Sequence, residues 1–171
     1  MSKELDENEK LLSGLRLLET PGHLLRRNHQ RSYEIFTELV GDDVTRQQMA
    51  LLVALYHNPG ATQTSLVNAT GFDRATIAEM VGRMVSRQWV MRSRDLQDAR
   101  AWTMHITDEG RDLLLDRIPR IVQAQEDILA PLPEEMRPVF IHCLRMLLGL
   151  GPEQVGSDTV LQSPPDGHRK T

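Results

Sequence analysis

Arginine is concentrated in the middle of the chain, where its chemistry suits contacts with nucleic acid. Six arginines and four acids lie within residues 73–100, so this segment is positive although the 171-residue chain has a formal net charge of -4. The arginines are Arg74, Arg83, Arg87, Arg92, Arg94 and Arg100. A guanidinium fork binds phosphate or guanine through two hydrogen bonds and enters a narrow minor groove readily. A solvated face with local ion pairs is the alternative interpretation.

The elements expected around these arginines favour the nucleic-acid interpretation. Residues 62–71 predict a short helix that ends at a glycine, and residues 73–88 predict a longer helix capped by Asp73. Residues 89–106 suit a two-stranded hairpin with an exposed charged tip, because polar and apolar residues alternate over its second half. A helix-turn-helix followed by such a hairpin is a winged helix, whose second helix enters the major groove.

Helical patterns also precede the winged helix. Leucines at helical spacing predict an amphipathic helix over residues 5–18. A second helix is expected over residues 21–40, with Thr20 as its cap and a proline in its first turn. Thr45 is the expected cap of a third helix, which stops at the sequence Asn-Pro-Gly.

Two further helices are expected after the hairpin. Thr107 caps the first, which continues to about Leu129, and Pro138 implies a kink or a late start in the second. The expected fold is therefore mainly α, a winged helix-turn-helix domain with N- and C-terminal helices. Its expected divisions are N-terminal helices at 1–44, the winged helix-turn-helix at 45–106, C-terminal helices at 107–150 and a disordered tail at 156–171.

Composition and motif content narrow the functional classes. The single cysteine cannot form an internal disulfide, the polar N-terminus lacks the order of a signal peptide, and no apolar run reaches the length of a membrane span. We expect a cytoplasmic protein outside the membrane. Because phosphate-binding glycine loops, paired cysteines and zinc-type histidine spacings are missing from the sequence, we expect no enzyme activity, no catalytic or metal-binding residue and no cofactor.

Residues 66–114 carry a family resemblance. The segment "LVNATGFDRATIAEMVGRMVSRQWVMRSRDLQDARAWTMHITDEGRDLL" resembles the MarR family of bacterial transcription regulators. The family's wing pattern, Asp-x-Arg, five residues and Leu-Thr-x-x-Gly, is matched by Asp98, Arg100, Ile106, Thr107 and Gly110, with isoleucine in place of leucine. The resemblance implies a homodimer with interleaved first and last helices. Such a dimer binds double-stranded DNA at a pseudo-palindromic operator and represses until a small ligand arrives.

The resemblance also implies roles for individual residues. Arg100 would enter the minor groove, and Asp98 would brace the wing through an ion pair. Further expected DNA-binding residues lie on the second helix of the motif and on the wing. They are Arg74, Ala75, Thr76, Ala78, Arg83, Arg92 and Arg94.

Three residues depart from the family pattern. Glu79 either accepts from a cytosine amine or pairs with Arg83 at i+4, and the intrahelical pair is the favoured interpretation. Gln88 replaces a helix-ending glycine at a position that needs a left-handed backbone, at a cost on the order of 1 kcal/mol. Ala99 stands where many relatives have a second arginine, so we predict a shallower salt dependence of DNA affinity.

Polar residues interrupt the apolar stripe of the second helix and indicate a ligand pocket. The interrupting residues are Asn28, His29 and Ser32, and the cations beside them are His23, Arg26, Arg27 and Arg31. Either the polar groups satisfy one another or a neighbouring helix across the dimer, or they line a pocket with an anion site. The segments "TPGHLLRR" and "DRATIAEMV" resemble MarR regulators of aromatic-acid breakdown, whose effector is an aromatic carboxylate or its coenzyme A thioester. The surplus of cations favours an aromatic acyl-CoA.

Two rival functions stay open at this point. Some MarR relatives sense oxidants through cysteine, but Cys143 lies on the apolar face of the last helix and is expected to be buried and inert. A DNA-binding protein with no effector is the second rival, because the pocket is inferred only from polar interruptions.

Overall fold

The computed structural model describes residues 2–94 and 101–151. Its elements in chain order are α1 (Ser2–Gly14), a 3-10 turn η1 (Leu17–Glu19), α2 (Pro21–Val40), α3 (Arg46–His57), β1 (Ala61–Thr62), α4 (Gln63–Thr70), α5 (Arg74–Ser86), β2 (Val90–Arg94), β3 (Trp102–Ile106), α6 (Asp108–Leu129) and α7 (Met136–Leu147). The expected mainly α, winged helix-turn-helix architecture is therefore present. The wing-tip residues Asp98, Ala99 and Arg100 and the tail 156–171 lie outside the described residues.

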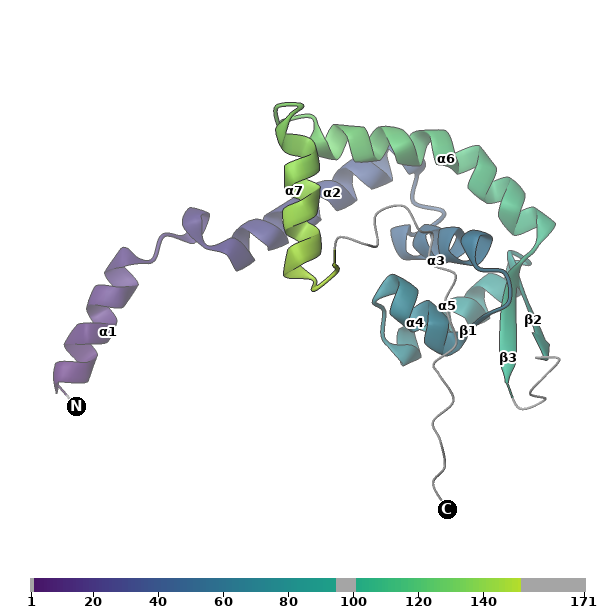
Figure 1. The fold of residues 1–171 in the computed structure, drawn as a ribbon, viewed down its shortest axis with the longest axis horizontal. Helices are drawn as coiled ribbons and strands as arrows, with labels where there is room; N and C mark the ends of the chain where they lie inside the picture. Colours follow the sequence, from purple (N-terminus) through teal and green to yellow (C-terminus); the bar gives the residue numbers. More distant parts are fainter. Residues whose placement is uncertain (1, 95–100, 152–171) are drawn as a thin grey trace, which may run out of the picture.

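The apolar core lies among α3, α4, α5 and the wing, beside the first half of α6 (Figure 1). Its fully buried side chains come mainly from α3, α4 and α5 and include Leu51, Leu52, Leu55, Leu66, Ile77 and Met84. Burial of a leucine or isoleucine side chain contributes on the order of 2 kcal/mol, so this cluster holds the recognition region as one unit. Leu114 of α6 and Val90 of β2 extend the cluster toward the wing.

The wing is a three-stranded antiparallel sheet in the order β1-β3-β2. β2 and β3 form the expected hairpin, with Val90 opposite Ile106 and Arg94 opposite Trp102. β1 is an addition to the expected hairpin, because two residues are too few to show an alternating pattern. It pairs with β3 and leads directly into α4, so the sheet is joined to the helix-turn-helix.

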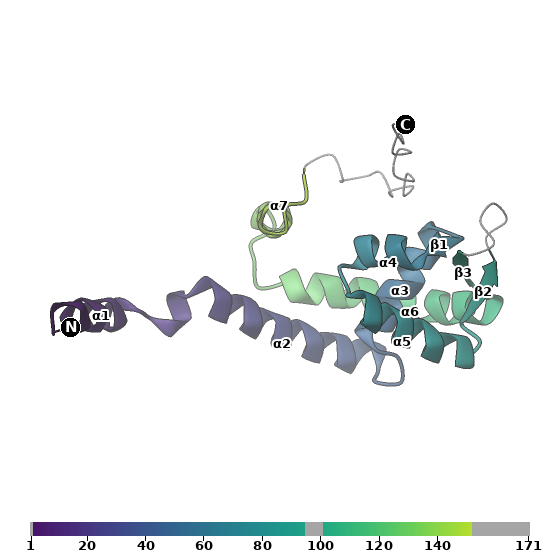
Figure 2. The ribbon, with the colours of Figure 1, turned by 90° about the horizontal axis from the view of Figure 1, so that it is seen from below.

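Helices α2, α6 and α7 lie outside the winged helix-turn-helix. α2 packs along α6, whereas α7 runs across the direction of α6 (Figures 1 and 2). α1 and α2 lead away from the recognition region one after the other in both views. Pro138 is the third residue of α7, so the late start expected from the sequence is confirmed.

Side-chain caps begin three of the helices as the sequence predicted. Thr45 accepts from the backbone of Gln48, Asp73 from Thr76, and Thr107 from Gly110. The expected cap at Thr20 is wrong, because its hydroxyl donates to the carbonyl of Arg16 and makes no bond into α2. A cap hydrogen bond forms only when the side chain turns toward the helix that follows.

Two surface properties bear on the sequence predictions. Among the described residues, no helix combines the length and apolar character needed to cross a membrane. Cys143 is exposed, so the expectation of a buried thiol is wrong for this chain. The apolar face that carries Cys143 is largely exposed along α7, with Leu147 at 73% exposure.

Candidate nucleic-acid interface and ligand pocket

Recognition helix α5 divides into a buried face and an exposed face. Ile77, Met80, Val81 and Met84 are buried in the core. The exposed face carries four of the residues predicted to contact DNA, which are Arg74, Ala75, Ala78 and Arg83. An amphipathic helix of this kind presents its polar face outward while the core fixes its position. That outward face is the one a major groove can receive.

Two of the residues predicted to contact DNA, Thr76 and Arg83, also bond to acidic side chains near them in the sequence. The Thr76 hydroxyl donates to the Asp73 carboxylate at 2.6 Å, and the Thr76 backbone N–H donates to the same group at 2.9 Å. These hydrogen bonds lower the pKa of Asp73. The Thr76 hydroxyl hydrogen is thus used by the cap. Glu79 pairs with Arg83, as the favoured interpretation of the sequence stated.

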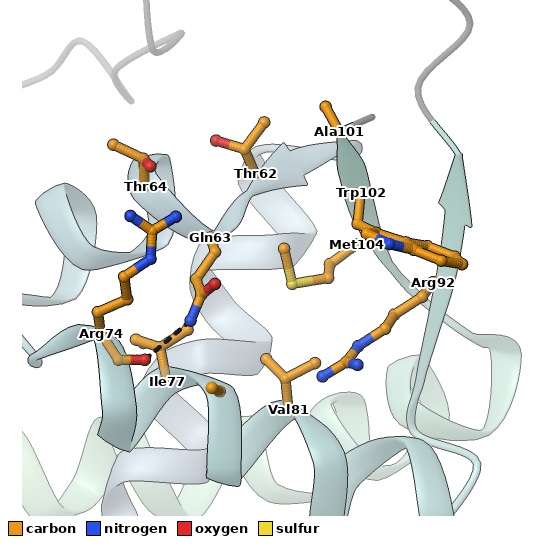
Figure 3. Close-up of a pocket in the computed structure, with 11 residues that line it drawn as sticks. Thr62, Gln63, Thr64, Arg74, Ile77, Val81, Arg92, Ala101, Trp102 and Met104 are labelled. Carbon is orange, nitrogen blue, oxygen red and sulfur yellow. Dashed lines mark hydrogen bonds between the residues drawn. The ribbon is translucent and has the colours of Figure 1, made fainter. Parts of the chain in front are cut away.

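A cleft of about 460 Å³ lies between α5, the start of α4 and the wing (Figure 3). Arg74 and Arg92 come from opposite sides of it, and Ile77, Val81 and Met104 form its apolar floor. Two guanidinium groups over such a cleft offer donors to a phosphodiester that passes between helix and wing. The cleft thus brings together a predicted helix residue and a predicted wing residue.

Sequence reasoning missed Gln63 as a part of this surface. Its side-chain amide donates to the backbone carbonyl of Arg74 at 2.8 Å and ties the start of α4 to the start of α5 (Figure 3). The hydrogen bond spans eleven positions of the sequence, and no local pattern indicates it.

The wing also holds Arg94 in a defined position. Its guanidinium carbon lies 4.1 Å from the ring centroid of Trp102, on the facing strand. A cation over an indole face gains about 0.5–1 kcal/mol at an exposed site. This contact holds the arginine against the side of the wing. Trp102 is 47% exposed and lines the cleft as well.

A second pocket, of about 300 Å³, lies between α2, α3, α6 and α7. Its apolar lining consists of Phe36, Ile128, Leu129, Phe140, Ile141 and Leu144. Ser32, Arg46 and Gln125 supply its polar groups. An apolar pocket of this size with a few convergent polar groups is typical of a site for a small molecule.

Arg46 is the cation of this pocket, and sequence reasoning missed it. Its Nη1 donates to the Ser32 hydroxyl at 2.8 Å, and its Nη2 lies 3.2 Å from His29 Nδ1. The histidine nitrogen accepts that bond when the ring proton is on Nε2. Two of the predicted ligand residues therefore meet at a guanidinium from another helix, 14 and 17 positions away.

His29 meets the pocket only through Arg46, and the five remaining predicted ligand residues are not part of the pocket lining. They are His23, Arg26, Arg27, Asn28 and Arg31. An α-helix turns about 100° per residue, so Arg27 lies about 140° around α2 from Ser32. The Asn28 amide donates to the carbonyl of Leu24 one turn earlier. The structure thus separates the exposed cations of α2 from the polar end of the pocket.

Comparison with known proteins identifies the family. A model of the MarR family matches residues 44–102. The HTH-type transcriptional repressor NicR of Pseudomonas putida is 34% identical over 131 residues, which span 76% of this chain and 83% of NicR. The chain belongs to the MarR family. It is a MarR-type transcriptional regulator with a winged helix-turn-helix fold.

Two solved MarR-like structures extend this likeness to the flanking helices. The PcaV regulator of Streptomyces coelicolor, in complex with its natural ligand, is 34% identical with a TM-score of 0.76, covering 80% of this chain and 96% of PcaV. BpsR of Bordetella bronchiseptica, whose DNA binding is regulated by 6-hydroxynicotinic acid, is 28% identical with a TM-score of 0.76, covering 78% of this chain and 96% of BpsR. The structural likeness therefore extends beyond the matched segment 44–102.

Proposed function

We propose that this MarR-family chain is a homodimeric repressor of aromatic-acid breakdown genes, released from its operator by a small aromatic carboxylate. The observation that carries the effector class is the single guanidinium of Arg46 at the polar end of a mainly apolar pocket. A planar carboxylate matches a guanidinium through two hydrogen bonds, and an aromatic ring suits the apolar lining. BpsR, a similar protein, responds to an aromatic carboxylate of this class.

Exposed apolar side chains on the terminal helices support the homodimer. They lie on or directly beside α1, η1, α6 and α7 and include Leu11, Leu12, Leu15, Leu18, Val122, Leu147 and Leu148. Exposed apolar patches mark association sites. In a symmetric dimer the same surface of each copy meets the other. α1 and α7 lie away from α5 and the wing, so DNA contact is compatible with pairing through them.

The proposed dimer would read a pseudo-palindromic operator. Each α5 enters a major groove, and two recognition helices of a symmetric dimer fit half-sites about 34 Å apart. The effector acts only if it binds a form of the dimer with a different spacing more tightly than the DNA-bound form. The pocket lies between α2, α3, α6 and α7. A ligand bound there would change the position of α2, α6 and α7 relative to the winged helix-turn-helix.

A coenzyme A thioester is the second candidate effector. Arg26, Arg27 and Arg31 are exposed and have no acidic partner within the described part of the chain. The phosphates of coenzyme A could use them. The 300 Å³ pocket would then hold only the aromatic acyl end. The free acid is favoured, because Arg46 offers the pocket a cation that a thioester does not need.

Displacement from DNA tests the effector. The wild-type protein first selects its operator from a random duplex pool, and the affinity for this duplex is then measured with benzoate, 6-hydroxynicotinate or benzoyl-CoA. We expect a free acid to weaken DNA binding at least about fivefold, the lower end of usual coupling between sites. Displacement by benzoyl-CoA alone would transfer the proposal to the thioester. Displacement by none of the three would refute it.

The predicted wing contacts require a separate test with the same duplex. Arg100→Ala should abolish operator binding while the dimer persists by light scattering, and intact binding would refute the wing assignment. Ala99→Arg should steepen the slope of log affinity against log salt by about 0.9 for one added phosphate contact. An unchanged slope would remove the role assigned to Ala99.

A further inference from the structure

We propose that Asp43 and Arg87, with Arg117 as their support, are positioning residues that couple the ligand pocket to recognition helix α5. They meet at the turn of residues 41–45 between α2 and α3, here called the α2–α3 turn. The turn is the point where the helices that line the pocket contact the helix that is proposed to read DNA. The pocket side of this coupling rests on the proposed function, whereas the DNA side does not.

The contact between the turn and α5 is specific. Arg87 is the C-cap residue of α5, and its Nη1 donates to the backbone carbonyl of Asp43 at 2.9 Å. Its guanidinium carbon also lies 4.8 Å from the Trp89 ring centroid. The side chain of Arg87 is thus held between an indole ring and a carbonyl. A shift of Asp43 must either move the end of α5 or break this contact.

The same turn is tied to α6 by Arg117. Its Nη2 lies 3.1 Å from the Asp43 carboxylate, and its Nη1 donates to the carbonyl of Val40 at the end of α2. The Arg117 side chain is only 18% exposed. A largely buried guanidinium that bonds to the turn and to the end of α2 is costly to strip of these partners. Because of Arg117, a movement of α6 or of the end of α2 would also move the turn.

The backbone of the turn allows little adjustment. Gly41 has φ +98° and ψ 176°, a conformation open almost only to glycine. A Cβ at Gly41 would lie 3.0 Å from the Asp43 carboxylate and 3.3 Å from Arg117 Nη1. Val44 is buried in the core at 1% exposure. The chain is fixed on both sides of Asp43, so the turn moves as a piece.

The pocket cation lies close to this piece in sequence. Arg46 begins α3 and follows the Thr45 cap, so only two residues separate it from Asp43. An anion bound by Arg46 would pull on the start of α3, while the carbonyl of Asp43 accepts a hydrogen bond from the end of α5. Two sites are coupled when one element has different positions that each ligand favours unequally. The α2–α3 turn bonds to the end of α5 through Asp43 and caps α3, the helix that begins with Arg46, through Thr45.

Hydrogen exchange tests the DNA side of this coupling without any effector. Backbone exchange of residues 41–48 is compared with and without saturating selected duplex in the wild type, Arg87→Ala and Arg120→Ala. Arg120→Ala is the control, because it removes an arginine of α6 that is exposed as Arg87 is. We expect DNA to slow exchange at the turn in the wild type and the control, and this protection to be lost in Arg87→Ala. Retained protection in Arg87→Ala overturns the proposal.

The effector side is read as a ratio of DNA affinities with and without the probe acid, benzoate or 6-hydroxynicotinate. Arg87→Ala should bind the probe as the wild type does, yet the ratio should fall toward one. A simple phosphate contact by Arg87 would weaken DNA binding equally with and without probe, leave the ratio unchanged, and so count against the proposal. If neither probe weakens wild-type DNA binding, the proposed effector class fails, and the exchange result alone decides the coupling.

Asp43→Asn separates the two partners of the turn. The substitution keeps the backbone carbonyl that Arg87 uses but removes the charge that faces Arg117. We expect the loss of DNA-induced protection to be partial, between the wild type and Arg87→Ala. Thermal unfolding of each variant identifies any loss of fold. Arg87 is exposed, so we expect its substitution to leave the core intact. Wild-type protection in Asp43→Asn would remove Arg117 from the coupling.

Discussion

Arg46 Nη1 lies 2.8 Å from Ser32 Oγ, so the start of α3 meets the middle of α2 at the polar end of the pocket. The hydrogen bond positions the guanidinium without neutralising it, because serine carries no charge. His29 occupies a further guanidinium nitrogen at 3.2 Å. The remaining donors of the fork are available to an anion. This geometry makes Arg46 the most informative residue for testing the effector.

We predict that Arg46→Met lowers the affinity for an effector acid by about 10- to 100-fold. Hydrogen bonds to charged groups contribute about 1.5–3 kcal/mol, and 1.4 kcal/mol corresponds to a factor of ten. Arg46→Lys should lose less, since it keeps the charge but not the fork. Titration calorimetry with 6-hydroxynicotinate measures both. Arg27→Met is the matched control. Because Arg27 lies on another face of α2, this substitution should change the affinity by less than about twofold. Equal losses at the two arginines would contradict a pocket centred on Arg46.

Gln88→Gly should stabilise the fold by up to about 1 kcal/mol. Gln88 has φ 61°, and a side chain in the left-handed region costs about 1–2 kcal/mol, partly offset by the greater freedom of glycine when unfolded. The carbonyl of Gln88 keeps its bond from the Thr107 hydroxyl in the variant. Thermal unfolding at fixed protein concentration should show a rise of about 2–4 °C. Gln88→Ala retains the Cβ and should show no such rise, and equal effects of the two would argue against relief of backbone strain.

The fold was largely predictable because its signals are local. A cap such as Thr45 or Asp73 bonds to a backbone group three residues later, so its evidence lies within one turn of sequence. The late start at Pro138 follows from a single residue type, whereas the left-handed backbone at Gln88 was expected from the family resemblance, because many relatives have glycine there. Thr20 shows the limit of such signals, since its hydroxyl bonds backward to Arg16.

The candidate sites were predictable only in part, because they depend on contacts between distant segments. The exposed residues of α5 followed from helical periodicity. Arg46 could not be found in this way, because its partners lie 14 and 17 positions away on another helix. The exposure of Cys143 likewise depends on which helix covers α7, and apolar spacing alone does not state that.

Gly110→Ala should destabilise the fold strongly, whereas Gly82→Ala should stabilise it. A Cβ at Gly110 would lie 2.1 Å from the backbone carbonyl oxygen of Trp89, a backbone atom that cannot move aside alone. Overpacking of this kind costs about 1–3 kcal/mol. A Cβ at Gly82, in the interior of α5, meets nothing within 4 Å, and alanine there gains about 0.5–1 kcal/mol. Denaturant unfolding measures both variants. A tolerated Gly110→Ala would show that α6 can move away from the wing.

Asp73→Asn should remove part of the acid sensitivity of the fold. Hydrogen bonds from the Thr76 side chain and backbone hold the pKa of Asp73 below its ordinary value of 3.8. A carboxyl with a lowered folded-state pKa stabilises the fold above its unfolded-state pKa, and this contribution is lost as the pH falls through the folded-state value. Asparagine still caps a helix but does not titrate. The difference in melting temperature between wild type and Asp73→Asn should therefore shift in favour of the variant as the pH falls below 3.8. Other acids titrate alike in both proteins and cancel in this difference. A difference that stays constant through the acid range would show that the Asp73 charge adds nothing to the cap.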